Sequence, residues 1–452
     1  MFATNGMQVS ERPPLVGRGL LVFLLVWPVL WSNGKIADVS DPGRFVTLPT
    51  QLRFIEPVVL AAVIAFAVLF GRPQVDRFLR ATIVALAVVC VAGVVGSSLA
   101  FPGVVNALYG TYDVTVAFVL VIAVLVLDYN RQELAIVSAY FFLLCFVNWF
   151  VGVDQAVVMG VQADRIHGLY DDANTMSTIF YVVSGYCLYR YAIARTVPHL
   201  LYGLFLIPMA YLGFNEKLNL FFLGLMLPLI LFRLTRNPMH MLFAAIVGIA
   251  LLSLTLGFAE RSGLTGRTST VSDLVRGRGG FGALGVIRSW PLAWEQISDH
   301  PATLLFGSGA SNFGGAVAAN RFNNGTATSI TNEVFQFQTS AEYLGAFDSP
   351  TNYFTNVLAE FGLVGFLAIV GLLGFILRRL HTLGKKHRNP DLVAAAWAAK
   401  WGWVIVGMQA LFVPFGAFGN LAVMVPIALA TAVVVVEGRH LDRTSSDSAF
   451  TA

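Results

Sequence analysis

Repeated runs of about twenty apolar residues constrain this chain more than any other feature of its sequence, because such a run matches the hydrocarbon thickness of a bilayer. Of its 452 residues, 57% are hydrophobic and only 12% are charged, whereas a soluble domain carries about 25% charged residues. A water-soluble globule, a disordered chain and a fibrous repeat are therefore excluded. We predict an all-α integral membrane protein with about 12 transmembrane helices, at 16–31, 55–71, 80–101, 112–129, 133–153, 175–193, 198–214, 217–235, 239–258, 353–378, 395–416 and 418–437.

Lys and Arg residues in the loops predict the orientation of these helices. With a cytoplasmic N-terminus, 17 of them lie in inside segments and 5 in the short outside loops. This bias predicts that both termini are cytoplasmic. It divides the chain into nine membrane helices within residues 1–258, a long outside loop at 259–352, and three membrane helices with a cytoplasmic tail at 353–452.

Charge and cysteine content exclude further classes of protein. The net charge is +4 and there is no dense basic run, so we expect no nucleic-acid partner. The three cysteines, Cys90, Cys145 and Cys187, all lie inside apolar runs. Neither a disulfide framework nor a zinc knuckle is expected from such positions. The first apolar run has no small-residue cleavage site after it, so we interpret it as a retained span.

The loop at 259–352 is the one long hydrophilic segment of the sequence. It is rich in Gly, Ser, Thr and Asn, and a loop of this length in a compact protein is usually functional. Apolar residues recur at helical spacing within it, at Ile287, Trp290, Trp294 and Ile297. This spacing predicts an amphipathic helix that lies on the membrane surface or against the spans.

Three cations at the predicted outer side are candidates for a phosphate-binding site, because ionisable residues near a bilayer are often functional. They are Arg165 before the sixth span, Lys217 in the hairpin between the seventh and eighth spans, and Arg288 in the long loop. Arg offers a fork of donors to phosphate oxygens and Lys a point charge, as a lipid-linked pyrophosphate would need. Ion pairs with neighbouring carboxylates, or contact with lipid head groups, are the alternatives.

Four short motifs in order resemble the bacterial O-antigen ligase and O-antigen polymerase superfamily. They cover roughly residues 160–375 and consist of Arg165-x-x-Gly168 followed by Asn174, the polar turn with Lys217, Arg288 and Trp294 followed by the stretch 299–313, and Asn352 followed by Glu360 and Gly365. The ligases carry a His where this chain has Thr351. That departure favours the polymerase branch and leaves the proton acceptor open.

The resemblance implies a glycosyltransferase with an outer catalytic cavity in the bacterial inner membrane. Its donor and acceptor would be glycans on undecaprenyl pyrophosphate, and its partners would also include membrane lipid and a protein that regulates chain length. Arg165, Lys217 and Arg288 would stabilise the leaving pyrophosphate. No cofactor and no metal are expected.

The attacking sugar hydroxyl needs a proton acceptor, which Thr351 cannot be. Asp348 is the favoured base and Glu342 and His167 are the alternatives. His167, Glu342, Asn174 and Asn352 are expected to contact substrate, although Asn174 suits a helix N-cap equally well. We expect structural roles for Glu360, which would orient the return of the loop, and for His300 at a helix end.

Two other functions compete with the polymerase. One is a ligase of the same superfamily that transfers glycan to a lipid or protein acceptor. The other is a flippase or secondary transporter, which would need charged residues and broken helices near the middle of the bilayer. The predicted spans are nearly free of charge and the polar residues gather at the outer side, so the sequence favours an enzyme.

Overall fold

The computed structural model has helices that overlap ten of the twelve predicted spans. The described residues are 15–30, 35–37, 45–47, 55–70, 75–100, 104–127, 129, 131–159, 166, 168–170, 173–212, 239, 242, 246, 281–310, 313, 352–387, 389–411, 418 and 420–450. Apart from residues 239, 242 and 246, the predicted spans 217–235 and 239–258 lie outside this set.

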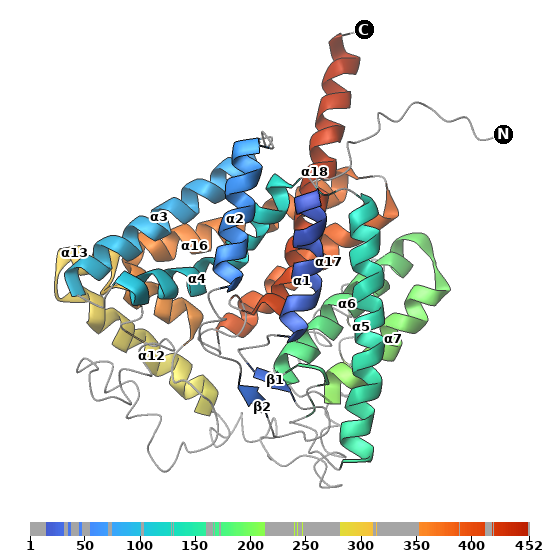
Figure 1. Ribbon diagram of the computed structural model, residues 1–452, viewed down its shortest axis with the longest axis horizontal. Coiled ribbons are helices and arrows are strands. Elements are labelled where there is room, and N and C mark those ends of the chain that lie inside the picture. Colours follow the sequence, from blue (N-terminus) through green and yellow to red (C-terminus); the bar gives the residue numbers. More distant parts are fainter. Residues whose placement is uncertain are drawn as a thin grey trace.

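Figure 1 shows how the described helices are arranged. They are α1 (Leu15–Leu30), α2 (Ile55–Phe70), α3 (Arg77–Ala100), α4 (Val104–Val126), α5 (Arg131–Val157), α6 (Ala173–Ala194), α7 (Val197–Leu212), α12 (Phe281–Ser298), α13 (Pro301–Phe306), α16 (Tyr353–Lys386), α17 (Pro390–Ala410) and α18 (Leu421–Phe450). Within the described residues, four helical segments are long and apolar enough to cross a membrane, namely Arg77–Leu99, Ala135–Gln155, Tyr353–Lys386 and Leu421–Arg439. Shorter apolar helices accompany them, so the chain is a helical membrane protein.

A small hairpin is added to this helical architecture. Strand β1 (Lys35–Ala37) pairs antiparallel with β2 (Phe45–Thr47), with Ile36 opposite Val46. β-branched residues suit a pleated strand, and three residues per strand leave the fold class unchanged. The hairpin lies at the lower end of the molecule in Figure 1, as does the C-terminal end of α5.

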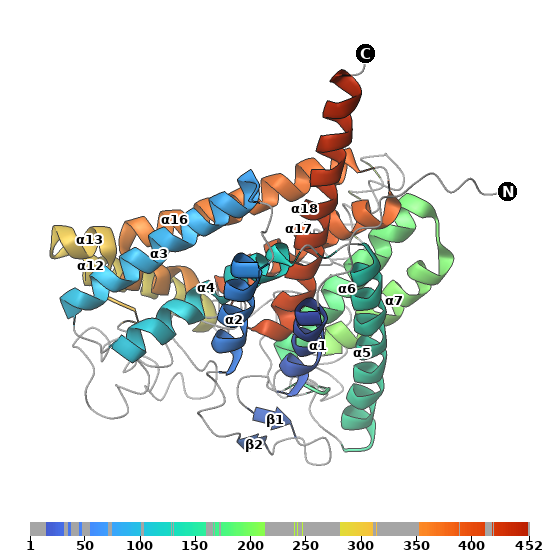
Figure 2. The same cartoon turned by 45° about the horizontal axis from the view of Figure 1, so that its top comes forward.

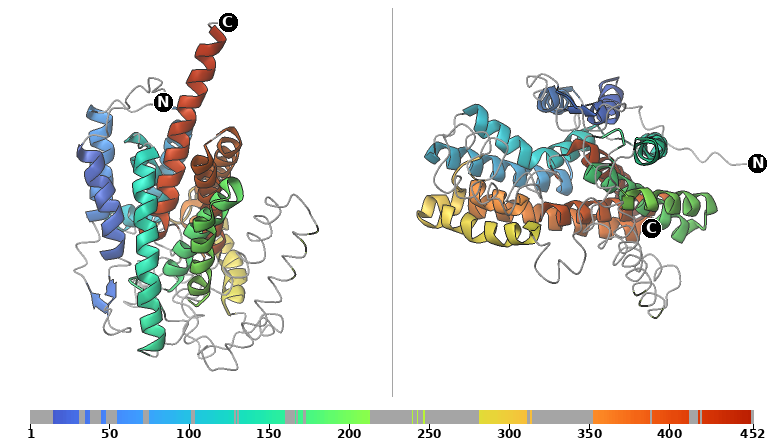
Figure 3. Two further views of the ribbon diagram at one scale, coloured as in Figure 1. Left: turned by 90° about the vertical axis from the view of Figure 1, so that its right-hand side faces the viewer. Right: turned by 90° about the horizontal axis from the view of Figure 1, so that it is seen from below.

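Helix α18 lies at the centre of the fold. It contacts α1, α4, α5, α6, α16 and α17, and 83% of its apolar segment is buried. Aromatic rings pack around it: the ring of Phe118 in α4 stacks on Trp403 in α17 at 5.6 Å between centroids. The Trp403 indole also donates a hydrogen bond to Thr431 Oγ1 of α18 at 3.0 Å. Helices α1, α2 and α5 lie on the outside of this core (Figures 2 and 3).

Polar contacts between helices respect the two predicted sides of the membrane. Contacts between segments predicted to be inside are the ion pair of Arg439 with Asp76 at 2.8 Å, that of Arg190 with Asp391 at 2.5 Å, and the bond from the Tyr129 hydroxyl to the Gly17 carbonyl. Contacts between segments predicted to be outside are Tyr112 to Glu56 at 2.5 Å, Asn420 to Thr175 at 2.7 Å and Ala310 to Ser97 at 3.2 Å. Each of these contacts therefore joins segments assigned to the same side.

The amphipathic helix predicted in the long loop is confirmed as α12, which packs against α16 and α13. Leu292, Ala293 and Ile297 are buried against α16, whereas Trp294 is 51% exposed. The reason is that α13 and the start of α16 cover one side of α12 and leave Trp294 outside the contact. Figure 3 (right) shows α12 and α16 side by side.

Candidate functional site

The N-terminal end of α16 is built around Asn352, a predicted substrate-binding residue. Its side-chain oxygen accepts a hydrogen bond from the backbone amide of Thr355 at 3.0 Å. The backbone amide of Asn352 in turn donates to Thr355 Oγ1 at 3.2 Å. This reciprocal pair is a capping box, which satisfies amides at the start of the helix. Asn352 is fully buried, and its side-chain oxygen therefore has a structural role as the cap of α16.

The other end of the Asn352 side chain ties α12 to α16. Asn352 Nδ2 donates to Ser289 Oγ at 3.2 Å, and both residues are buried. Ser289 directly follows Arg288 in the sequence. The hydrogen bond therefore brings the backbone of Arg288 to the start of α16, which joins two of the motifs that are far apart in sequence.

A second connection runs from α16 to the start of α6. The rings of Tyr353 and Phe418 lie 4.7 Å apart. Two residues further on, Asn420 caps α18 and donates from Nδ2 to Thr175 Oγ1 at 2.7 Å. Thr175 follows Asn174, the second residue of α6. The N-terminal ends of α6, α16 and α18 thus meet, and the positive ends of their dipoles favour an anion there.

The glycine-rich stretch after α13 docks on a break in α16. Gly362 interrupts α16 with φ 65° and ψ −170°, which frees carbonyl groups of the preceding turn. The Ala359 carbonyl accepts from the Ser308 amide at 2.9 Å, and the Glu360 carbonyl accepts from the Gly309 amide at 3.1 Å. Two motifs noted in the sequence are thus the two sides of one backbone contact.

Glycine is required on both sides of this contact. Gly307 has φ 79° and ψ 178°, and both it and Gly362 lie in a region of backbone conformation that is essentially limited to glycine. A Cβ atom on Gly307 would lie 2.3 Å from the Glu360 carbonyl carbon, and one on Gly362 would lie 2.5 Å from the Gly307 nitrogen. The helix and the loop therefore approach as closely as two backbones can.

Glu360 and His300 have the structural roles that the sequence indicates. The Glu360 side chain is 3% exposed and its Oε1 accepts a hydrogen bond from the Phe313 amide at 3.1 Å, which fixes the loop beyond Gly309. His300 caps α13, with Nδ1 accepting from the Ala302 amide at 3.1 Å.

Two residues that were not predicted from the sequence hold the backbone at Gly168 and Leu169. Gln155 of α5 bonds both the amide and the carbonyl of Gly168, at 3.1 Å each, and Asn148 accepts from the Leu169 amide at 2.7 Å. Gly168 has φ 62°, and a Cβ there would lie 2.3 Å from Asn148 Oδ1. The glycine of the Arg-x-x-Gly motif is thus explained by its contact with α5.

The remaining predicted residues are only partly placed. Arg288 lies in α12 and Asn174 in α6, with side chains outside the described part of the structure. The predicted site residues outside the described residues altogether are Arg165, His167, Lys217, Glu342 and Asp348. Within the described ranges, no group of three His, Cys, Asp or Glu side chains is arranged to hold a metal ion.

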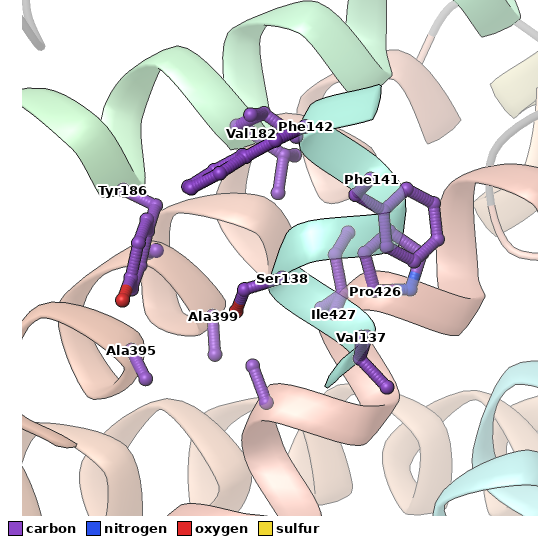
Figure 4. A pocket seen from close by; sticks show the side chains of 13 residues that line it. Val137, Ser138, Phe141, Phe142, Val182, Tyr186, Ala395, Ala399, Pro426 and Ile427 are labelled. Carbon is purple, nitrogen blue, oxygen red and sulfur yellow. The ribbon is translucent and has the colours of Figure 1, made fainter. Parts of the chain in front are cut away.

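A cavity between α5, α6, α17 and α18 lies apart from these motifs (Figure 4). Its lining is apolar except for Ser138 and Tyr186, and includes small residues such as Ala395 and Ala399. None of its lining residues is a predicted site residue. No protein-family model matches the chain and no curated protein is significantly similar to it.

Proposed function

We propose that the chain polymerises undecaprenyl-pyrophosphate-linked glycan repeats on the periplasmic side of a bacterial inner membrane. The observation that supports this best is the Asn352–Ser289 hydrogen bond. It joins the end of the long loop to the residue after Arg288, and so gathers two motifs of the resemblance at one helix end. The proposed enzyme has twelve spans with both termini in the cytoplasm.

The reaction follows from the chemistry of the leaving group. A hydroxyl of one lipid-linked repeat attacks the anomeric carbon of another, a new glycosidic bond forms, and undecaprenyl pyrophosphate departs with the bonding electrons. The hydroxyl proton passes to a base, for which Asp348 is our first candidate. Arg165, Lys217 and Arg288 stabilise the charge on the departing pyrophosphate, assisted by the N-terminal ends of α6, α16 and α18.

Deletion of the gene tests the proposal directly. We expect surface polysaccharide on a gel to collapse from a ladder to a single repeat on its acceptor, because initiation and transfer would continue without polymerisation. Complete loss of glycan from the acceptor would identify a ligase instead. Lipid-linked repeats that accumulate only on the cytoplasmic side would identify a flippase. Restoration of the ladder by a plasmid copy is the control.

The proposed orientation has its own test. In a variant without native cysteines, we expect a Cys at Ser311 to react with a membrane-impermeant maleimide in intact spheroplasts, because 259–352 would be outside. A Cys at the exposed Lys385 should react only after permeabilisation. Labelling is read as a mass shift on a gel, and the reverse pattern would contradict both the topology and the location of the site.

A further inference from the structure

Asn356 is a buried side-chain amide one helical turn after Asn352. This residue is 1% exposed, and in the described part of the structure neither its Oδ1 nor its Nδ2 has a hydrogen-bond partner. Buried polar groups in proteins almost always have partners. An apolar side chain of similar shape would be more stable here, so the presence of an amide needs an explanation.

The position of Asn356 on α16 indicates what it faces. Residues four apart lie on the same side of a helix, so Asn352, Asn356 and Glu360 form one polar stripe. Its two ends bond to the long loop, Asn352 to Ser289 of α12 and Glu360 to the amide of Phe313. Asn356 therefore lies between two anchored contacts, on the side of α16 that carries α12 and the glycine-rich stretch.

The residues of α12 that pack on α16 beside this stripe belong to a cluster distinct from the main core of the membrane helices. Helix α12 packs on α16 through a small apolar cluster of its own, made of Leu292, Ala293, Ile297, Phe313, Leu358 and Ala359. The main core includes none of these residues. The contact of α12 with α16 beside Asn356 is therefore made mainly by residues other than those packed around α18, with Phe366 in contact with both clusters.

We propose that Asn356 binds a hydroxyl group of the sugar next to the pyrophosphate and so helps to select which glycan reacts; this inference rests on the proposed function. A primary amide offers both donors and an acceptor, as a sugar hydroxyl requires. It is uncharged, so it does not compete with the cations for the pyrophosphate. It lies about 6 Å along α16 from Asn352, with the charged group expected at the helix end and the neutral sugar further along.

The test compares Asn356→Leu with Asn356→Gln and with Leu367→Ala, which changes an exposed position of the same helix. Purified proteins are assayed for polymer formation from the lipid-linked oligosaccharide fraction extracted from the deletion strain, over a range of concentrations, and their melting temperatures are measured. We expect Asn356→Leu to raise KM about tenfold or more while its melting temperature stays the same or rises. Asn356→Gln should recover part of the activity, and Leu367→Ala should match the wild type.

Three results would overturn this inference and they are distinguishable. Wild-type kinetics in Asn356→Leu would show that the amide has no part in binding. A lower melting temperature together with lost activity would show that the amide holds the structure. If the wild-type protein makes no polymer from this fraction, the proposed function fails and this inference fails with it.

Discussion

Replacement of Arg288 by alanine is expected to abolish the polysaccharide ladder. The backbone of Arg288 is held at the start of α16 by the neighbouring Ser289–Asn352 bond, where the proposed pyrophosphate binds. Loss of one preorganised group that stabilises a developing charge typically reduces the rate by about 10²–10³. The measurement is the length distribution of surface polysaccharide in the deletion strain that carries the variant, at matched expression.

The control for this experiment is Lys385→Ala, which removes an exposed cation near the far end of α16. It should leave the ladder unchanged. Arg288→Lys should retain more activity than Arg288→Ala, because it keeps a charge but not the fork of donors. A normal ladder in Arg288→Ala would remove the pyrophosphate site from this part of the molecule.

Gly307→Ala and Gly362→Ala are expected to have the largest effects on stability. Each substitution places a Cβ atom in contact with the backbone of the opposite segment. It also puts alanine in a backbone conformation that is essentially limited to glycine. We expect a loss of about 2–5 kcal/mol in the free energy of unfolding. This corresponds to a decrease in melting temperature on the order of 5–10 °C, measured on detergent-solubilised protein.

Gly371→Ala in the same helix is the matched control. A Cβ there meets no atom within 4 Å, and alanine is favoured over glycine in a helix by about 1 kcal/mol. Its melting temperature should be unchanged or slightly higher. Equal behaviour of Gly307→Ala, Gly362→Ala and Gly371→Ala would mean that the close contact between α13 and α16 does not form.

The helices were predictable because their signal is local. A membrane span needs about twenty apolar residues in a row, and an amphipathic helix needs a period of 3.6. The spans that coincide with α3, α5, α16 and α18 and the helix within 281–298 follow from these rules. Which side of α12 is buried depends instead on its packing against α13 and α16, which the local spacing does not determine.

The supporting residues of the site were not predictable because their partners are distant in sequence. Asn148 lies inside an apolar run and Gln155 lies just beyond it, and nothing near them indicates that they bond to residues around Gly168. Ser289 bonds to a residue 63 positions away. The glycines were recognisable as a motif, but their reason, a contact between two backbones, appears only when the loop and the helix are brought together.

The central position of α18 has a consequence for synthesis of the protein. This helix follows the other described helices in the sequence, yet it contacts α1, α4, α5, α6, α16 and α17. During synthesis, the earlier helices are therefore inserted in the bilayer before α18, the helix around which they pack, has been made. The start of α6 likewise lacks Asn420 until then. A chain that stops before residue 421 would therefore be inserted in the membrane but unassembled, and a natural substrate for quality-control proteases.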